Sequence, residues 1–580
     1  MKSITPDRLV AAGLAATLGM PLVWATWGAV DSALDVQAWQ NLTTDSQAPR
    51  ALLMTLWTGL MSSLLSVASA AWLLSRGFPS AVWARWVRAL SPMLAVPHAA
   101  FAIGLAFLIA PSGWLLRALS PWATSFDAPP PWLTTQDPWG LGLIAVLVAK
   151  EVPFLLWAAA TQLQRADVAQ HFTRELQVAR SMGYGPRKAW RIVLWPQLWP
   201  RLRWPMLAVL AYSLTVVDMA LVIGPTSPPT LAVLAWQWLL DSDVSLNSQG
   251  AAAAWVLALA LAVSAVMFWQ LPRLLVWRGR WTSGKRGHMG VSVRGAIRAT
   301  RTRVPGAFGS TAFAVLVGLY GAVMLALAVG SVSGVWPFPA LWPQSLTWAA
   351  WQSVATSATT VGTTLTLALA SAAAAMLWSV AWLECAPSRW DAQLRRVIYL
   401  PLVLPSVLWV VGVHTMALRW GIDATWAGVW LAHSLATVPY VLIALSPAYT
   451  GFDVRYRHIA ASLGHGRAVF LWRVKWPLLR AALASACAVG FAVSVAQYLP
   501  TLFVGAGRFS TVTTEAVTLA SGAQRSLTAA YAWLQWLLPV IGFGLAAWVG
   551  GQGSAKVRFR HLNQLRVASV ADNPLIKSDD

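Results

Sequence analysis

Charged side chains are scarce in this sequence. They make up 11% of its 580 residues, against roughly 25% in an average soluble domain. Hydrophobic residues make up 57% of the chain, so a soluble fold of this composition could not cover its own surface with polar groups. The shortage of charge excludes a soluble enzyme and a disordered protein. The 38 tryptophans fit a chain that crosses two membrane–water interfaces many times. The composition therefore predicts a polytopic membrane protein.

Acidic residues and cysteines are scarcer still. The chain has 20 Asp and Glu against 42 Lys and Arg, a formal net charge of +22. The basic residues lie in short connectors between apolar runs, without interleaved aromatics on a polar face, so nucleic acid is not an expected partner. The two cysteines, Cys385 and Cys487, are about a hundred residues apart and imply no disulfide or metal framework.

Long apolar runs occupy the space between the connectors. A hydrocarbon core about 30 Å thick needs about 20 apolar residues in one helix. The first run could be a signal peptide, but it is long and lacks a convincing cleavage site, so it is interpreted as the first helix. The predicted fold is all-α, with about 12 transmembrane helices in two tandem sets of six. The runs are 9–30, 51–75, 92–115, 139–163, 204–224, 251–271, 307–331, 346–383, 397–418, 425–447, 482–504 and 528–550.

The distribution of basic residues predicts the topology. The connector 272–304 carries nine basic residues and no acid, and the segment 164–203 carries eight against two acids. Lys and Arg concentrate on the cytoplasmic side of membrane proteins, so both termini and the long loops near 164–203 and 448–480 are predicted to be cytoplasmic. The predicted outer loops hold only five of the 42 basic residues: Arg50, Arg117, Arg419, Arg508 and Arg525.

These patterns divide the chain into four segments. We predict a first six-helix half over 1–275, a basic cytoplasmic linker over 276–305, a second six-helix half over 306–552 and a cytoplasmic tail over 553–580.

The two halves repeat each other. Five pairs of identical residues are each separated by 281 positions, across a loop, a membrane helix and an outer loop. A constant offset of this kind indicates two copies of one unit, and six crossings return each copy to the same side of the membrane. The pairs are Gly183 and Gly464, Pro196 and Pro477, Ser213 and Ser494, Gly224 and Gly505, and Thr230 and Thr511.

The repeated cytoplasmic loop predicts a helix, a glycine turn and a second, short helix. Glycine at 183 and 464 can end the first helix in the left-handed conformation. Gly185 and Pro186 then open the second helix, as Gly466 does in the other copy, and Pro196 and Pro477 are expected to limit it. A basic amphipathic helix held in this way is interpreted as a docking element for a partner. The alternatives are a connector that lies on the membrane surface and a contact to lipid headgroups.

The same loop resembles that of the membrane subunit of an ATP-binding-cassette importer. That family carries Glu-Ala-Ala, three residues, Gly and a hydrophobic–Pro end in this loop. The matched positions are Gln177, Ala179, Gly183 and Pro196 in the first copy, and His458, Ala460, Gly464 and Pro477 in the second. Both copies keep the last alanine and the glycine, and both replace the glutamate. The resemblance covers nearly the whole chain and is greatest to the permeases of thiamine, ferric-iron and related importers.

The resemblance implies a mechanism and a set of partners. Two cytoplasmic ATPase subunits would each clasp one short helix, around 186–194 and 467–475, and a periplasmic binding protein would deliver a small solute to the outer mouth. ATP and Mg²⁺ would be used by the ATPase. No Gly-x-x-x-x-Gly-Lys-Ser/Thr loop occurs in this sequence, so we expect it to bind no cofactor and to catalyse no reaction itself. The expected location is the bacterial inner membrane.

Three polar residues in membrane runs are candidates for the translocation pathway. Burying charge in lipid is costly, so ionisable groups there are functional hypotheses. Glu151 and Asp218 are interpreted as lining the pathway, and Gln497 lies near the position in the second half that corresponds to Asp218. Two carboxylates would suit a cationic cargo, such as a thiamine-like cation or ferric iron. The alternative is a satisfied network between helices without cargo contact.

Two other classes of protein share some of these features. A self-contained secondary transporter also uses twelve spans in two repeats, but it would not need the two glycine-containing loops. A membrane-embedded transferase would need clustered acids or histidines at one interface, and none cluster in this sequence.

Overall fold

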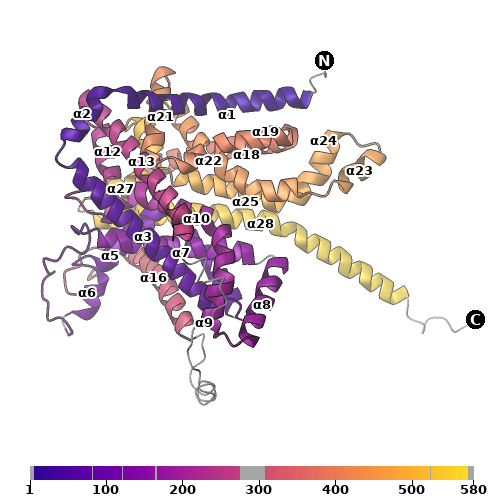
Figure 1. Cartoon of the computed structure of the whole chain (residues 1–580), viewed down its shortest axis with the longest axis horizontal. Coiled ribbons are helices and arrows are strands. Elements are labelled where there is room, and N and C mark those ends of the chain that lie inside the picture. The colour runs from indigo at the N-terminus through magenta and orange to yellow at the C-terminus, as the bar shows by residue number, and fades with distance from the viewer. Residues whose placement is uncertain are drawn as a thin grey trace, which may run out of the picture.

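The computed structural model describes residues 6–80, 82–120, 122–163, 166–274, 307–522 and 524–571. Within these ranges the regular structure is helical, and β-structure is limited to two isolated bridges. The predicted linker 276–305 lies outside the described residues, and so does the end of the predicted tail. Helix α28 (Arg525–Ala571) extends well into that tail, as Figure 1 shows near the C-terminus.

The helices before residue 275 form the first half. They are α1 (Pro6–Asp31), η1 (Ser32–Leu34), α2 (Val36–Thr44), α3 (Ala48–Gly77), α4 (Trp83–Leu94), α5 (His98–Ile109), α6 (Trp114–Leu119), α7 (Leu141–Leu163), α8 (Ala166–Ser181), α9 (Pro186–Ala189), η2 (Trp190–Leu194), α10 (Trp195–Thr215), α11 (Asp218–Ile223), α12 (Leu231–Leu239) and α13 (Val244–Leu274).

The second half repeats this order, except that η1 and α6 have no counterpart and the short α20 is added. Its elements are α16 (Ala307–Ser331), α17 (Ala349–Thr356), α18 (Ala358–Cys385), α19 (Ser388–Ile398), α20 (Leu400–Val403), α21 (Ser406–Arg419), α22 (Trp426–Thr450), α23 (Arg455–Ser462), α24 (Arg467–Phe470), η3 (Leu471–Lys475), α25 (Trp476–Val495), α26 (Leu499–Gly505), α27 (Val512–Ala520) and α28.

Ten helical segments of the described residues are long and apolar enough to cross a membrane, and one of them, His98–Leu119, joins α5 and α6. The predicted all-helical polytopic fold is therefore confirmed. The expected runs 204–224 and 397–418 correspond to helices that are more polar or shorter than predicted. Helix α10 includes Arg201 and Arg203 and ends at Thr215, and α21 has 14 residues because its chain leaves helical geometry at Pro405.

The first helix of each half packs against the other half. Helix α1 lies along α21, and α16 lies along α5. Both contacts depend on a glycine, because a Cβ at Gly412 would overlap the carbonyl oxygen of Ala25, and one at Gly104 would come within 2.6 Å of Val323 Cγ1. We call this arrangement, in which the first helix of each half packs on the other half, the exchange of the first helices. At both contacts glycine lets the backbones of two helices approach closely, which is the usual role of small residues between membrane helices.

A second contact recurs in both halves. The hydroxyl of Thr55 on α3 accepts a hydrogen bond from the backbone N–H of Leu231 at 2.7 Å, where α12 begins. In the second half, Thr364 on α18 accepts one from Val512 at 2.9 Å, where α27 begins. Leu231 and Val512 are again 281 positions apart. The sequence repeat thus extends to the packing of the helices.

Arg117 joins the loops at the opposite end from the glycine-containing loops. Its guanidinium donates to the carbonyls of Ser112 at 2.9 Å, Pro337 at 2.8 Å and Ala340 at 2.7 Å. Because Ser112 belongs to the first half and the other two acceptors to the second, this side chain ties the halves together on the α6 side of the molecule (Figure 1).

The exchange of first helices gives a prediction for Gly412. The variant Gly412→Ala should destabilise the protein by about 1–3 kcal/mol, because the added methyl overlaps the backbone of α1. A methyl group added at Gly362 on α18 would meet no heavy atom within 4 Å, so Gly362→Ala should be neutral or stabilising. Thermal unfolding in the same detergent compares the two. Equal melting temperatures would contradict the close approach of α1 and α21.

Candidate docking loops and translocation pathway

The first glycine-containing loop ends α8 with a hydrogen-bonded cap. Gly183 has φ +86°, in the left-handed region. The N–H of Tyr184 donates to the carbonyl of Ala179 at 3.1 Å, and that of Gly183 to Arg180 at 3.0 Å. This pair of bonds is a Schellman motif, which satisfies carbonyls that the end of the helix would leave unpaired.

The second loop has the same geometry. Gly464 has φ +74°, the N–H of His465 donates to Ala460 at 2.9 Å, and that of Gly464 to Ala461 at 3.0 Å. A Cβ at either capping glycine would meet no atom within 4 Å, so the left-handed backbone alone requires glycine there.

The cap explains which positions of the loop are retained. Ala179 and Ala460 supply the first carbonyl of each cap and are both 5% exposed. Gln177 and His458, which stand where the family has glutamate, are exposed. The buried alanine is therefore constrained by packing, whereas the position two residues earlier is not.

The short helices that follow do not end where the sequence predicted. Gly185 and Gly466 are extended N-caps, and α9 and α24 continue through the π turns η2 and η3 into α10 and α25. The expectation that Pro196 and Pro477 limit the short helices is wrong. A proline ring clashes with the carbonyl four residues earlier, and the wider turn relieves this clash, since Trp195 bonds to the carbonyl of Trp190 five residues back.

Exposed apolar side chains occupy equivalent places on the two loops. Val178 is 59% exposed and Ile459 is 56% exposed, while Met182 and Leu463 are 58% and 67% exposed. Each of these pairs is separated by 281 positions. In the first loop they border a groove of about 370 Å³ between α8 and the following turn, lined also by His171, Glu175 and Tyr184.

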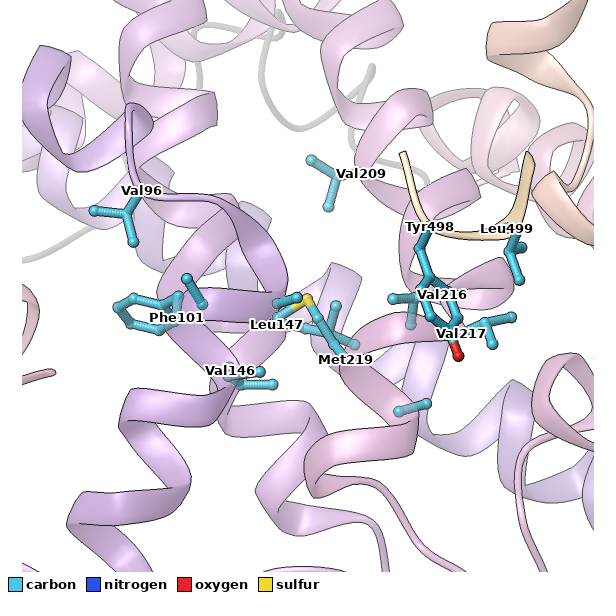
Figure 2. Close-up of a cluster of buried hydrophobic side chains, with 14 of the residues drawn as sticks. Val96, Phe101, Val146, Leu147, Val209, Val216, Val217, Met219, Tyr498 and Leu499 are labelled. Atoms are coloured by element: carbon cyan, nitrogen blue, oxygen red, sulfur yellow. The ribbon is translucent and has the colours of Figure 1, made fainter. Parts of the chain in front are cut away.

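The candidate pathway residues lie where two helices are interrupted. Helix α10 ends at Thr215, and Asp218 is the first residue of α11. Helix α25 ends at Val495, and Gln497 lies in the gap before α26. The two interruptions are at equivalent positions of the repeat, and Figure 2 shows that they face each other, with Tyr498 and Leu499 beside Val216 and Val217.

Asp218 and Glu151 come together with a histidine and a tyrosine. The Nε2 atom of His98 is 3.8 Å from Glu151 Oε1, and the His98 ring packs on Tyr212 at 4.6 Å between centroids. His98 and Tyr212 also lie near Asp218. The two carboxylates thus share His98 as a neighbour.

Two tyrosines of the second half complete this group. Tyr440 lies near Tyr212, and Tyr498 lies near Asp218. Tyr440 is 41% exposed and the side chain of His98 is 43% exposed, whereas Glu151 is buried. We call His98, Glu151, Tyr212, Asp218, Tyr440, Gln497 and Tyr498 the central polar group.

The polar groups of Lys150 and His433 form hydrogen bonds with residues outside the central polar group. The ammonium of Lys150 donates to the carbonyl of Val96 at 2.6 Å and lies over the rings of Phe101 and Tyr320. Both ring nitrogens of His433 are hydrogen-bonded at 2.8 Å, to Ser494 and to Thr501. Each is therefore a satisfied contact between helices.

The sequence did not single out the three tyrosines or His98. Tyrosine is rare in this chain, with nine residues in 580, and three of these belong to the central polar group. That scarcity is a usable signal, since the phenol supplies a polar tip on an apolar body.

Lys150 gives a prediction that separates structure from transport. Lys150→Met should lower stability by about 1–3 kcal/mol, because the buried carbonyl of Val96 loses its donor. The apparent affinity for cargo should change little, since the ammonium is hydrogen-bonded to Val96 and acts on the central polar group only through its charge near Glu151. Thermal unfolding and the KM for uptake measure the two effects. A raised KM with unchanged stability would place Lys150 in the pathway.

An all-helical membrane protein with two equivalent halves, each carrying a glycine-capped loop, has the architecture of a transport permease. The chain belongs to the ABC transporter permease family. It is 35% identical over 542 residues to the inner membrane ABC transporter permease protein YnjC of Escherichia coli, an alignment that covers 93% of this chain and 96% of that protein. It is thus a multi-pass inner-membrane permease subunit of a transporter that also comprises an ATPase and a binding protein.

Shorter similarities agree with this assignment. The molybdenum transport system permease protein ModB of Mycobacterium tuberculosis, and that of Mycobacterium bovis, are each 32% identical over 127 residues, covering 20% of this chain and 48% of ModB. No family model matches the chain.

Proposed function

We propose that this chain forms the whole translocation pathway of an importer and docks two ATPase subunits through the loops 177–196 and 458–477. The main support is the equivalence of the loops: both have the same cap, the same short helix and exposed apolar residues at the same positions. Two identical ATPase subunits would need two such surfaces. The basic residues around the loops favour a cytoplasmic position for them and for both termini.

The continuity of the short helices supports a route for coupling. Because η2 and η3 join the docking helices to α10 and α25, movement of a loop moves a membrane helix. Helix α10 has 21 residues and spans about 30 Å at 1.5 Å per residue. The C-terminal end of α10 is followed closely by Asp218, and the C-terminal end of α25 by Gln497. ATP-driven closure of the ATPase pair would therefore reach the central polar group directly.

We propose a small organic cation as the cargo. The central polar group has two carboxylates, three tyrosines and the basic side chain of His98, while the nearby Lys150 donates to Val96 and acts on Glu151 through its charge. Tyrosine faces attract cations. This chemistry favours a thiamine-like cation over an oxyanion such as the name ModB suggests for that relative. Within the described residues no three His, Cys, Asp or Glu side chains form a metal-binding group, which favours an organic cation over ferric iron.

The partners have separate roles in this proposal. The ATPase subunits bind ATP and Mg²⁺ and carry out hydrolysis, and this chain binds no cofactor. A periplasmic binding protein would deliver cargo on the α6 side, where the loops tied by Arg117 are located. A self-contained secondary transporter is the alternative, and it would need neither ATPase nor binding protein.

The docking assignment is tested by two variants two residues apart. Gly464→Leu should cost about 1–2 kcal/mol at the left-handed cap and reorient the short helix. Gly466→Leu is the matched control, because Gly466 has φ −70° and equally open surroundings. We expect ATPase subunits to co-purify with the native chain and with Gly466→Leu but not with Gly464→Leu. Transport by a chain that purifies alone, without ATP, would support the secondary transporter.

The cargo assignment is tested at Asp218. Asp218→Asn removes one charge at nearly constant size, and it should raise the KM for a cationic cargo about tenfold, equivalent to ~1.4 kcal/mol. ATP-dependent uptake of thiamine, ferric iron and molybdate into vesicles with the co-purified ATPase and binding protein identifies the class. Uptake of molybdate that Asp218→Asn leaves unchanged would overturn the cationic assignment.

A further inference from the structure

The two docking helices differ in how they are attached to the membrane helices. In the second loop, Arg467 opens the short helix and Lys475 ends its π turn. Both side chains reach one carboxylate, Glu384, near the end of α18. By the 281-residue offset, the first loop has Pro186 and Leu194 in these places, and neither can form an ion pair.

Glu384 accepts hydrogen bonds from three elements. Its Oε2 atom accepts from Lys475 Nζ at 2.7 Å and from the Tyr449 hydroxyl at 2.9 Å. Its Oε1 atom and its backbone carbonyl accept from Arg467 at 3.4 Å and 3.0 Å. Tyr449 belongs to α22, so this carboxylate joins α18, α22 and both ends of the docking helix.

A second carboxylate extends the network to the first half. Arg467 donates from one guanidinium nitrogen to both oxygens of Asp7, at 2.6 and 2.7 Å. Asp7 lies in the first turn of α1, the helix exchanged onto the second half. The second docking helix is therefore bound to α1 as well as to α18.

Among the described residues, no ion pair attaches the first docking helix to a membrane helix in this way. Helix α3 is the counterpart of α18, and the charged group near its end is Arg76, whose electrostatic neighbour is Arg187 of the docking helix. Two like charges oppose each other where the second half has an ion pair. The first loop is held instead from within, by Glu175 of α8, which accepts from Gln197 at 2.6 Å.

We propose that Glu384 and Asp7 form an ionic clamp that positions the second docking helix and makes it the more rigidly coupled of the two. The effect of the clamp on the ATPase rests on the proposed docking function, whereas its effect on the position of the loop is independent of that function. Charge-assisted hydrogen bonds to a carboxylate that is mostly buried are among the stronger polar contacts in proteins, and Glu384 is 17% exposed. Movement of the second loop is thereby transmitted to α1 and α18, and that of the first loop mainly to α10.

Hydrogen exchange on the full chain in nanodiscs tests the clamp without any partner. The native chain should exchange more slowly over 467–475 than over 186–194. Glu384→Gln should raise exchange over 467–475 about tenfold and leave 186–194 unchanged. Asp453→Asn is the matched control, because it removes from the same loop a carboxylate that is paired with the exposed Arg455. Unchanged exchange in Glu384→Gln would overturn the clamp.

A second variant guards against loss of folding. Asp7 is half exposed, so Asp7→Asn should insert and fold normally while weakening the hold on Arg467. Its exchange over 467–475 should rise by a smaller factor than in Glu384→Gln. An effect confined to α1, with no change at 467–475, would also overturn the clamp.

Coupling is measured with the co-purified ATPase and binding protein in vesicles. Glu384→Gln should lower transport per ATP hydrolysed several-fold while the KM for ATP stays the same, which a loss of folded protein would not do. Faster exchange at 467–475 with an unchanged transport ratio would establish the contact and overturn its role in coupling. Loss of ATPase co-purification in Gly464→Leu, measured separately, tests the docking assignment itself.

Discussion

In a hydrocarbon layer no water can satisfy an unpaired backbone group, so every interruption of a membrane helix has to be compensated by the protein. The compensating groups in this molecule come from neighbouring helices. Ser406 donates to the carbonyl of Thr215 at the end of α10, Thr513 to that of Val495 at the end of α25, and Lys150 to that of Val96. Because Ser406 belongs to the second half and Thr215 to the first, the break beside Asp218 is compensated by a group from the other half. The central polar group depends on these contacts.

The sequence predicted the features that are local or repeated. The 281-residue offset and the glycine positions were enough to predict two helix–Gly–helix loops, since a left-handed cap requires little beyond glycine and a helix end. The exchange of α1 and α16 between halves could not be predicted, because it depends on which helix faces Gly412 and Gly104. The same holds for the meeting of His98 with Asp218. The π turns were missed because proline was interpreted as a stop, whereas a wider turn accommodates it.

Because the first helices are exchanged, a difference between the two docking loops affects helices of both halves. Helix α1 belongs to the first half by sequence, but its packing and its Asp7 ion pair serve the second. An ATPase that moved the second loop would thus displace helices of both halves, and one that moved the first would act mainly through α10. A fused chain can keep such a difference, because its two halves can diverge independently, which two copies of one chain cannot do.

The geometry of the cap explains why the two loops can differ from the family at the glutamate position but not at the alanine position. Ala179 and Ala460 are buried, and their carbonyls complete the turn, so a larger residue there would open it. Gln177 and His458 face outward and make no contact that the fold requires. A carboxylate could be lost at these positions without disturbing the loop, provided that another contact held the partner. The exposed pairs Val178 with Ile459 and Met182 with Leu463 are well placed for that contact, because apolar burial at the centre of an interface contributes more to affinity than an ion pair at its rim.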